Sequence, residues 1–388
     1  MYILYAPPSK FGIIPPKTPL ISDEVLFTNN IAYCPKFFWQ KYHVLQGCLD
    51  LTPNWMVRRR QTRDLRSILV LAGGGIGDSL WIMPFVKALH KRHPQANIMV
   101  MTNERAMPIW QHVPYCSACV KDEFWNMQSL IRRCEEVYDF SGIATYMKKA
   151  ARMDPVDATF HYGGLPRPKS SSDCRAMLVV TLDEGKRAEA LLARHGVDTT
   201  KDKIITIALE TSTPNRNWPL SYTATLSTSL TQAGYKVIWL GESHDRAQAS
   251  LERSFTPTLA QNLVVPTPSN VVNLCGQTSL RDCIAILALS DVVVGSSSGL
   301  LCIATALEIP SVGLWGAYSP KCRDKYYIKW YPIWRPLPCS PCNQHWTECP
   351  HGHPAPCMKN IQPELVFTAV LHMLAKYPRS IIGKRPID

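Results

Sequence analysis

The chain has 388 residues, of which 46% are hydrophobic and 19% charged, a composition that argues against wholesale disorder and favours packed domains. Its length suggests two or three domains. Lys and Arg number 42 against 30 Asp and Glu, and the formal charge of +12 suits anionic partners such as phosphorylated glycans or membrane surfaces. Nucleic acid is the weakest option, because the basic residues are scattered and no helix-turn-helix, finger or aromatic-basic RNA signature is found.

Two further features set expectations about the protein's location. No stretch approaches the ~20 consecutive apolar residues of a membrane-spanning helix, and the first residues lack the basic start and long apolar core of a secretory signal. A cytoplasmic protein is therefore expected.

The first half of the chain predicts an appendage followed by an α/β lobe. Residues 1–65 hold Pro, aromatic residues and short apolar runs without a sustained period, which indicates an N-terminal extension. A β-branched run at 67–71 then precedes a glycine turn and a helical apolar stripe over 78–92. A strand at 96–102 and a short helix at 104–112 continue the rhythm of a parallel sheet with crossover helices.

The second half repeats this alternation. A helix is expected at 145–153, in a less regular stretch, and an amphipathic helix at 182–195. Further expected strands are 204–209, 236–240, 271–274, 292–295 and 311–315, and further expected helices are 222–233, 280–289 and 300–307. We therefore predict one doubly wound, Rossmann-like lobe at 66–180 and another at 181–388, with a ligand cleft between the carboxyl ends of their strands.

The glycine turn after the first strand carries a carboxylate. The run GGGIGD places Asp78 where a dinucleotide fingerprint has its third glycine, so that motif is incomplete. Asp78 at the start of a helix is either a helix-capping residue or a functional carboxylate facing the cleft.

With its flanking residues, this turn resembles the opening motif of the heptosyltransferases, glycosyltransferase family 9. The stretch GIGDSLWIMPFVKAL has the family's glycine, aspartate, apolar spacer and proline, with Pro84 at the proline position. The resemblance implies that Asp78 is the general base and that this lobe binds the acceptor.

A second block, LETSTPNRNWP, matches the family pattern of two hydroxyl residues, a cation and Trp-Pro. The cation is usually lysine and holds the donor diphosphate; here it is Arg216, whose planar fork also grips phosphate oxygens. A solvated loop arginine is the alternative. The other matching residues are Thr211, Ser212, Trp218 and Pro219.

A third block runs from Val271 to Gly316 and resembles the family's donor lobe. Ser297, Ser298 and Gly299 lie between a buried strand and a helix, where backbone N–H groups at a positive helix end suit a diphosphate. A simple strand-to-helix turn is the alternative. The family usually has Asp at Ser297 and His at Cys302, which puts the donor sugar in doubt. Glu242 is placed like the family acid that contacts the adenosine ribose, or is a surface Glu.

Four cysteines near the end form a C-x₂-C-x₆-C-x₇-C array in a proline-rich loop at 339–357. Cys339, Cys342, Cys349 and Cys357 suit tetrahedral zinc or iron in a structural site, and a disulfide or free thiols are the alternatives. His345, His351 and His353 are substitute ligands. Cys116 and Cys119 form a second pair, read as buried free thiols.

The resemblance implies a GT-B fold and an inverting glycosyltransferase. The enzyme would transfer a sugar, with heptose as the most favoured candidate, from an ADP-heptose-like donor to a glycan acceptor. Lipopolysaccharide core at the inner membrane face is the expected acceptor, and no catalytic metal is required. Two alternatives stay open within the same fold: another donor or a protein acceptor, and a catalytically silent sugar-nucleotide or glycan-binding protein. The thiol cluster adds a third, a metal-dependent scaffold.

Overall fold

The chain forms two compact units, Met1–Ala176 and Met177–Asp388. In this computed structural model, the described residues are 26–28, 31–33, 57–58, 67–73, 75–141, 153–209, 211, 213–241, 266–342, 349–352 and 354–379. The helix expected at 145–153 lies outside them, except for its last residue.

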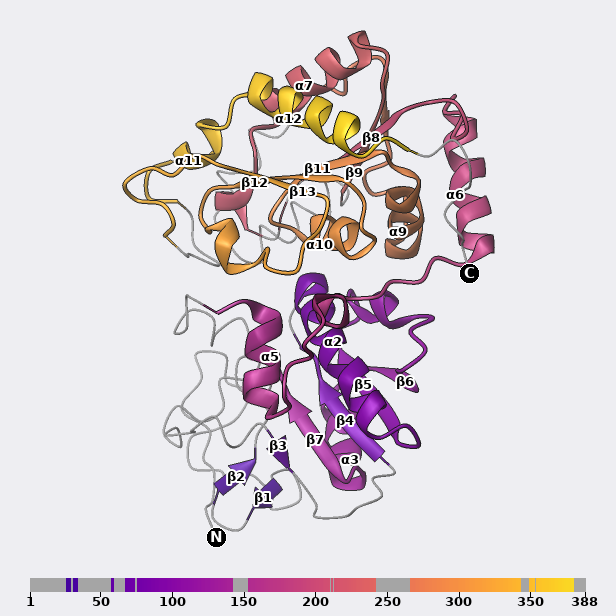
Figure 1. The fold of residues 1–388 in the computed structure, drawn as a ribbon, viewed down its shortest axis with the longest axis vertical. Helices are drawn as coiled ribbons and strands as arrows, with labels where there is room; N and C mark the ends of the chain where they lie inside the picture. Colours follow the sequence, from indigo (N-terminus) through magenta and orange to yellow (C-terminus); the bar gives the residue numbers. More distant parts are fainter. Residues whose placement is uncertain are drawn as a thin grey trace, which may run out of the picture. The chain divides into compact units, whose positions relative to one another are not determined.

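The first unit is built on a five-stranded sheet in the order β3-β7-β4-β5-β6 (Figure 1). Its strands are β3 (Val57–Arg58), β4 (Ser67–Leu71), β5 (Asn97–Thr102), β6 (Ala118–Lys121) and β7 (Glu136–Asp139). All neighbours are parallel except β3, an antiparallel edge strand contributed by residues expected to belong to the N-terminal extension. A separate hairpin joins β1 (Leu26–Thr28) to β2 (Ile31–Tyr33).

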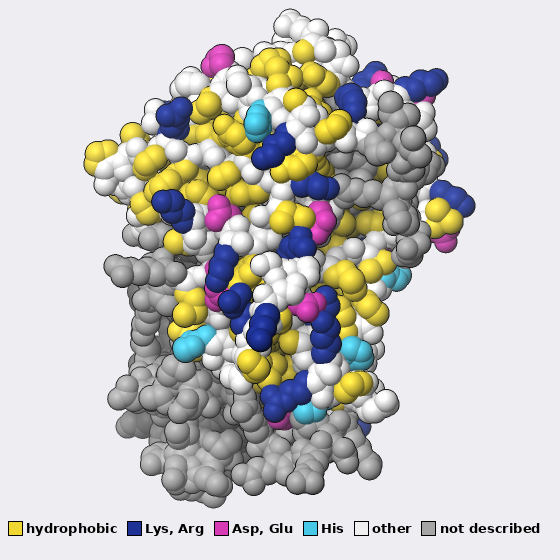
Figure 2. Space-filling view, viewed as in Figure 1, with side chains coloured by type: hydrophobic (Ala, Val, Ile, Leu, Met, Phe, Trp, Pro, Cys, Tyr) yellow, Lys and Arg dark blue, Asp and Glu magenta, His cyan; other side chains and the backbone are white. Residues whose placement is uncertain are grey.

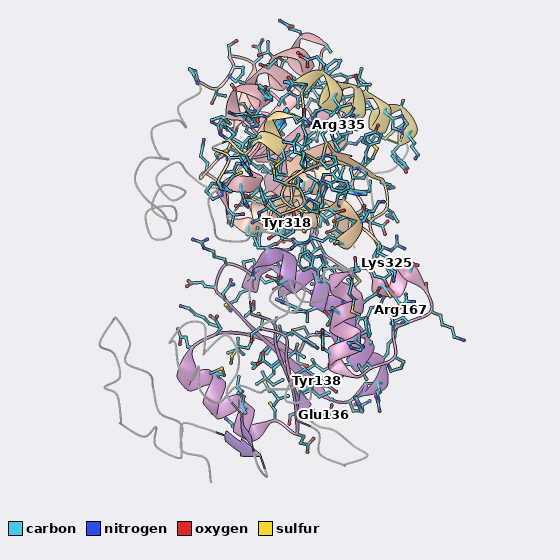
Figure 3. The ribbon with its side chains drawn as sticks, turned by 90° about the vertical axis from the view of Figure 1, so that its left-hand side faces the viewer. Glu136, Tyr138, Arg167, Tyr318, Lys325 and Arg335 are labelled. Atoms are coloured by element: carbon cyan, nitrogen blue, oxygen red, sulfur yellow. The ribbon has the colours of Figure 1, made fainter. Side chains whose placement is uncertain are left out.

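Helices α2 (Ile76–Arg92) and α5 (Pro155–Gly163) pack together in this unit, and α3 (Phe124–Arg133) follows β6. Phe85 of α2 lies in an edge-to-face aromatic cluster with Tyr138, Phe140 and Phe160, which fills the core beside β7. The Tyr138 hydroxyl donates a 2.6 Å hydrogen bond to Glu136, and Figure 3 shows the two side chains next to one another. This bond satisfies a carboxylate that is only 6% exposed.

The short helix expected at 104–112 is wrong in extent, since only a 3₁₀ turn, η2 (Met107–Trp110), forms there. Asn103 accepts a hydrogen bond from Ala106 N–H through its side chain, which favours a turn over a helix. Pro108 has no N–H for a helical bond, and His112 has a φ of 64°, which ends the turn.

The second unit contains a six-stranded sheet in the order β10-β9-β8-β11-β12-β13, and every neighbouring pair is parallel. The strands are β8 (Ile204–Ala208), β9 (Lys236–Leu240), β10 (Val271–Asn273), β11 (Val292–Ser296), β12 (Ser311–Trp315) and β13 (Trp330–Trp334). Strands β8, β11 and β12 are buried along their whole length, as expected of a parallel sheet covered on both faces. The predicted α/β class with parallel sheets is confirmed.

Helices cover both faces of this sheet. Figure 1 shows α7 (Leu220–Gln232) and α12 (Pro363–Lys376) on one side, and α9 (Leu280–Leu289) and α10 (Gly299–Ala306) on the other. The short α11 (Pro356–Lys359) precedes α12, and α6 (Leu182–Arg194) packs on α9.

Helix α6 is joined to α9 by a buried ion pair. A capping box starts α6, where Thr181 and Glu184 exchange hydrogen bonds of 3.3 and 2.9 Å. The Arg281 guanidinium donates to both Glu184 oxygens, at 2.7 and 2.6 Å, and to the Val179 carbonyl at 2.7 Å. Glu184 is 7% and Arg281 9% exposed, so this bidentate pair fixes α6 and the segment before it to the second unit.

Over the described part of the chain, none of the helices combines the length and apolar character needed to cross a bilayer.

Candidate functional site

Asp78 lies in the first turn of α2, just after β4, the central strand of the first sheet. Its Oδ2 accepts a 2.7 Å hydrogen bond from the backbone N–H of Gly75, the residue before the helix. The carboxylate therefore caps the helix, and its half-buried position at the carboxyl edge of β4 also leaves it accessible. The capping alternative and the functional one are thus compatible in this geometry.

The turn that carries Asp78 rests against the end of β7. A Cβ atom on Gly73 would lie 2.7 Å from the Cβ of Ser141, so only glycine fits there. Ser141 is held in place by Asp139, which is fully buried and accepts from the Ser141 N–H at 2.9 Å and from its hydroxyl at 2.5 Å. These contacts fix the backbone two residues before Gly75.

Arg216 occupies the equivalent edge of the second sheet, in the loop after β8. It lies in the 3₁₀ turn η4 (Pro214–Arg216) and is only 7% exposed. Its Nε donates to the Thr213 hydroxyl at 2.5 Å, and its Nη1 donates to the carbonyl oxygen of Ser297 at 2.6 Å. The solvated-loop alternative is therefore wrong: the guanidinium is buried against the turn that follows β11.

Thr211 shapes the same loop rather than standing apart from it. Its N–H donates to the Asn217 side chain at 2.7 Å, and its hydroxyl donates to the Thr213 carbonyl at 2.6 Å. Ser212 and Glu242 lie outside the described residues. Trp218 anchors the end of the loop by donating to the Ile361 carbonyl at 2.9 Å.

Ser297, Ser298 and Gly299 form the turn from β11 into α10, as expected. Ser298 is the N-cap, with its hydroxyl 3.5 Å from the Leu301 N–H that it accepts from. Orphan N–H groups and the helix dipole give this turn a positive character. Arg216 and the first turn of α10 therefore lie together at the carboxyl ends of β8 and β11.

A cavity of about 120 Å³ opens at this edge of the second sheet. Side chains from the ends of β8, β11 and β12, from the start of α7 and from Pro354 line it. The cavity lies where ligands of doubly wound sheets bind.

Ser297 and Cys302, the two residues that depart from the family pattern, each contact a side chain from another loop. Ser297 is 7% exposed and gives its carbonyl to Arg216. Cys302 accepts a hydrogen bond from the Tyr327 hydroxyl at 3.5 Å. At the position of the family Asp, Ser297 thus binds Arg216 through its backbone carbonyl. At the position of the family His, the Cys302 thiol lies beside Tyr327.

Two buried residues in the loop after β12 escaped the sequence reasoning. Tyr318 is 6% and Arg323 7% exposed, and the Arg323 guanidinium carbon lies 4.5 Å from the centre of the Tyr318 ring. Burial raises the pKa of Tyr318, and the nearby charges of Arg323 and Arg216 oppose that rise. Their position just after a parallel strand was the signal that marks them.

The four cysteines of the 339–357 loop are near one another without forming a recognisable metal site. Burial raises the pKa of the Cys357 thiol to about 11, and the Cys349, Cys342 and Cys339 thiols add to the rise. Cys342 is 3.9 Å from the Ala317 carbonyl oxygen. In the part of the chain that can be described, no three or more His, Cys, Asp or Glu side chains are arranged to hold a metal ion; His345 and His353 lie outside it.

Cys116 and Cys119 are free thiols, half-buried rather than fully buried. Burial raises the pKa of Cys116 to about 11 and that of Cys119 to about 12. A raised pKa favours the protonated thiol, which is a poor nucleophile.

Comparison with known proteins links these features to one family. The sequence model of glycosyltransferase family 9 (heptosyltransferase) matches residues 154–352, about half of the chain. Lipooligosaccharide heptosyltransferase 2 of Haemophilus influenzae is 31% identical over 108 residues, which are 28% of this chain and 29% of that protein. The chain therefore matches less than a third of the length of this curated relative.

Solved structures show the same fold. The Escherichia coli ADP-heptose lipopolysaccharide heptosyltransferase II aligns with a TM-score of 0.57 and 20% identity, over 80% of this chain and 99% of that one. An iron-containing dodecameric glycosyltransferase from enterotoxigenic E. coli aligns with a TM-score of 0.59 and 13% identity, over 82% and 78%. The expected GT-B class is confirmed, and the chain belongs to glycosyltransferase family 9, the heptosyltransferases.

Proposed function

We propose that this protein is an inverting glycosyltransferase that moves a sugar from a nucleotide diphosphate donor to a glycan hydroxyl. The observation that carries the proposal is the bond between Arg216 and the Ser297 carbonyl. It holds a buried cation beside the N-terminus of α10, and both features attract a diphosphate.

The proposal divides the reaction between the two units. Residues 66–180 bind the acceptor, and Asp78 takes the proton from its hydroxyl as that oxygen attacks the anomeric carbon. Residues 181–388 bind the donor, and Arg216 with Thr211, Ser212 and the amides near Ser298 and Gly299 neutralises the departing diphosphate. This scheme gives leaving-group stabilisation to protein groups and needs no catalytic metal.

ADP-heptose is the donor that the family supports best. The Haemophilus influenzae relative is a lipooligosaccharide heptosyltransferase, and the Escherichia coli structure is that of an ADP-heptose lipopolysaccharide heptosyltransferase. Glu242 is proposed to contact the ribose. Ser297 and Cys302 favour the alternative of a different sugar on the same diphosphate seat, because neither offers the carboxylate or imidazole of the family.

Lipopolysaccharide core is the proposed acceptor, reached from the cytoplasm with peripheral contact to anionic membrane; a protein acceptor is the alternative. The charge of +12 supports an anionic acceptor. Figure 2 shows Lys and Arg side chains spread over the visible face among hydrophobic and uncharged ones. On this face, such a distribution suits weak attraction to an anionic surface.

A catalytically silent sugar-nucleotide-binding protein is the second candidate. The hydrogen bond from Gly75 to Asp78 favours it, since that contact gives the carboxylate a structural role of its own. Measured transfer that depends on Asp78 separates the two.

We also propose a structural zinc or iron at Cys339, Cys342, Cys349 and Cys357. The spacing of the four cysteines in one proline-rich loop supports it, although the described side chains do not by themselves form a metal-binding group. Elemental analysis of purified protein, with Cys357→Ser as the variant, decides: one equivalent of metal that is lost in the variant supports the site, and equal metal content in both removes it.

A thermal-shift comparison of ADP-, GDP- and UDP-linked sugars tests the proposed donor. An ADP-sugar is expected to raise the melting temperature and the other two are not, because ligand binding to the native state stabilises it. No shift with any of the three would contradict the donor assignment.

A further inference from the structure

Two buried arginines lie in loops at the carboxyl edge of the second sheet: Arg216 after β8 and Arg323 after β12, the two strands that flank β11. Arg323 lies over the face of Tyr318, with 4.5 Å between the guanidinium carbon and the ring centre. Burial raises the pKa of Tyr318, and the charges of Arg323 and Arg216 both oppose that rise. Each arginine is only 7% exposed.

The segment that carries Tyr318 and Arg323 continues to Tyr327, whose side chain contacts α10. Arg216 bonds to the carbonyl of Ser297, directly before that helix. Cys302, whose N–H bonds to the Ser298 carbonyl at 3.1 Å, lies one turn further and receives the hydroxyl of Tyr327. The loop after β12 therefore contacts, through Tyr327, the same helix that begins just after the Ser297 carbonyl bound by Arg216.

The backbone next to Tyr318 is firmly packed. A Cβ on Gly316 would come within 2.6 Å of the Met358 sulfur and 2.7 Å of the Cys357 sulfur. The Ser340 hydroxyl donates to the Gly316 carbonyl. The cysteine-rich loop thus packs against Gly316, just after β12 and two residues before Tyr318. This packing holds the backbone near the Tyr318 ring, on which Arg323 stacks.

A diphosphate carries enough negative charge to engage two guanidinium groups at once, and the planar fork of each arginine can donate to two phosphate oxygens. The positive end of α10 adds to the same field.

We propose that Arg323 is a second diphosphate-binding residue, which forms with Arg216 a two-guanidinium seat at the start of α10, with Tyr318 orienting Arg323. This inference rests on the proposed donor role of the site and adds a residue that the family motifs do not include. The Tyr318 ring fixes the guanidinium by a cation–π contact before the ligand arrives, which lowers the entropy cost of binding.

Calorimetric titration of the full chain with ADP and with inorganic pyrophosphate tests the seat. We expect Arg323→Ala to lower the affinity for both ligands by about tenfold or more, since one charge-assisted contact is lost. Arg323→Lys keeps the charge but not the planar guanidinium, so its affinity for both ligands is expected to lie between that of Arg323→Ala and that of the unaltered protein. Tyr318→Phe keeps the ring and is expected to stay within about twofold of the unaltered protein.

Arg335→Ala is the matched control, because Arg335 is an exposed arginine of the same unit; Figure 3 labels it away from Tyr318. Its affinity for ADP should not change. Adenosine binding and the melting temperature without ligand should be preserved in Arg323→Lys, which excludes a general loss of structure. The affinity of Arg323→Ala should also depend less steeply on salt.

The outcomes are separable. Normal ADP and pyrophosphate affinity in both Arg323 variants, with weak binding in Arg216→Ala, would overturn the role of Arg323 and leave the proposed function intact. Unaltered protein that binds neither ADP nor pyrophosphate would overturn both.

Discussion

The guanidinium of Arg216 reaches across 81 positions of sequence to the carbonyl oxygen of Ser297, with 2.6 Å between Nη1 and that oxygen. The bond ties the loop after β8 to the turn after β11, the two central neighbours of the second sheet. A cation at this place is held in one orientation before any ligand binds. Preorganisation of this kind raises affinity because less conformational freedom is lost on binding.

Replacement of Arg216 by Ala should therefore weaken the binding of ADP. Loss of a charge-assisted hydrogen bond of about 1.5–3 kcal/mol predicts a dissociation constant about ten- to a hundredfold higher. Isothermal titration with ADP measures it, and Arg335→Ala serves as the exposed control. Equal affinity in Arg216→Ala and the unaltered protein would remove Arg216 from the donor site.

Asp78→Asn separates proton transfer from donor binding. We expect transfer to fall by about 10²–10⁴, the usual contribution of a general base, while ADP affinity stays nearly unchanged. Discontinuous product analysis with an accepted donor gives the rate. Asp173→Asn is the control, because Asp173 is an acid of the same unit that pairs with Lys87 and Lys91 at 2.9 Å. Full turnover in Asp78→Asn would leave Asp78 as a helix cap only.

The Glu184–Arg281 pair predicts a pH-dependent stability. Burial opposes ionisation, but hydrogen bonds and charge from Arg281, together with bonds at Thr181, outweigh it and lower the pKa of Glu184 to about 2 from 4.5. The stabilisation is therefore present above about pH 4.5 and is lost as the pH falls toward 2.

Glu184→Gln should destabilise the protein by about 3–5 kcal/mol at pH 7, because it leaves Arg281 buried without its countercharge. The difference from the unaltered protein should shrink as the pH falls below 4, as urea unfolding at several pH values can measure. Asp183→Asn, an exposed acid in the same helical turn, is the control. A difference that does not depend on pH would contradict the electrostatic explanation.

Gly313 is a packing requirement of β12. A Cβ there would lie 2.0 Å from Cη2 of Trp330 and 2.7 Å from Nε1 of Trp315. Gly313→Ala should cost about 1–3 kcal/mol through overpacking, measured as a lower melting temperature. The double variant Gly313→Ala/Trp330→Leu makes room, so it should lose less stability than the sum of its single changes. Simple additivity would show that the contact is not the cause.

Much of the fold follows from local signals in the sequence. The capping box at Thr181 and Glu184 marks the start of α6, and the buried β-branched runs mark β4, β8 and β11 within one residue. Two of the strands that were not predicted carry weaker signals, whereas helix α12 was missed although its apolar pattern is clear. Strand β7 is only four residues long, and β13 contains Pro332, which a sheet tolerates there because β13 is an edge strand.

The candidate site was predictable in its parts but not in its connections. The family resemblance selected Asp78, Arg216 and the turn at Ser298 from the sequence. No local pattern could predict that Arg216 is buried against Ser297 or that Arg323 stacks on Tyr318, because those contacts depend on strand order and loop packing. The loop after β12 was overlooked although its place just after a parallel strand marked it as a candidate.

The bonds from Arg281 to Glu184 and to the Val179 carbonyl also set a limit on how the chain can be divided. A fragment of the second unit that begins after α6 would retain the arginine but omit both of its acceptors. Its designer should therefore start the fragment at or before Met177, where the contact boundary between the units falls.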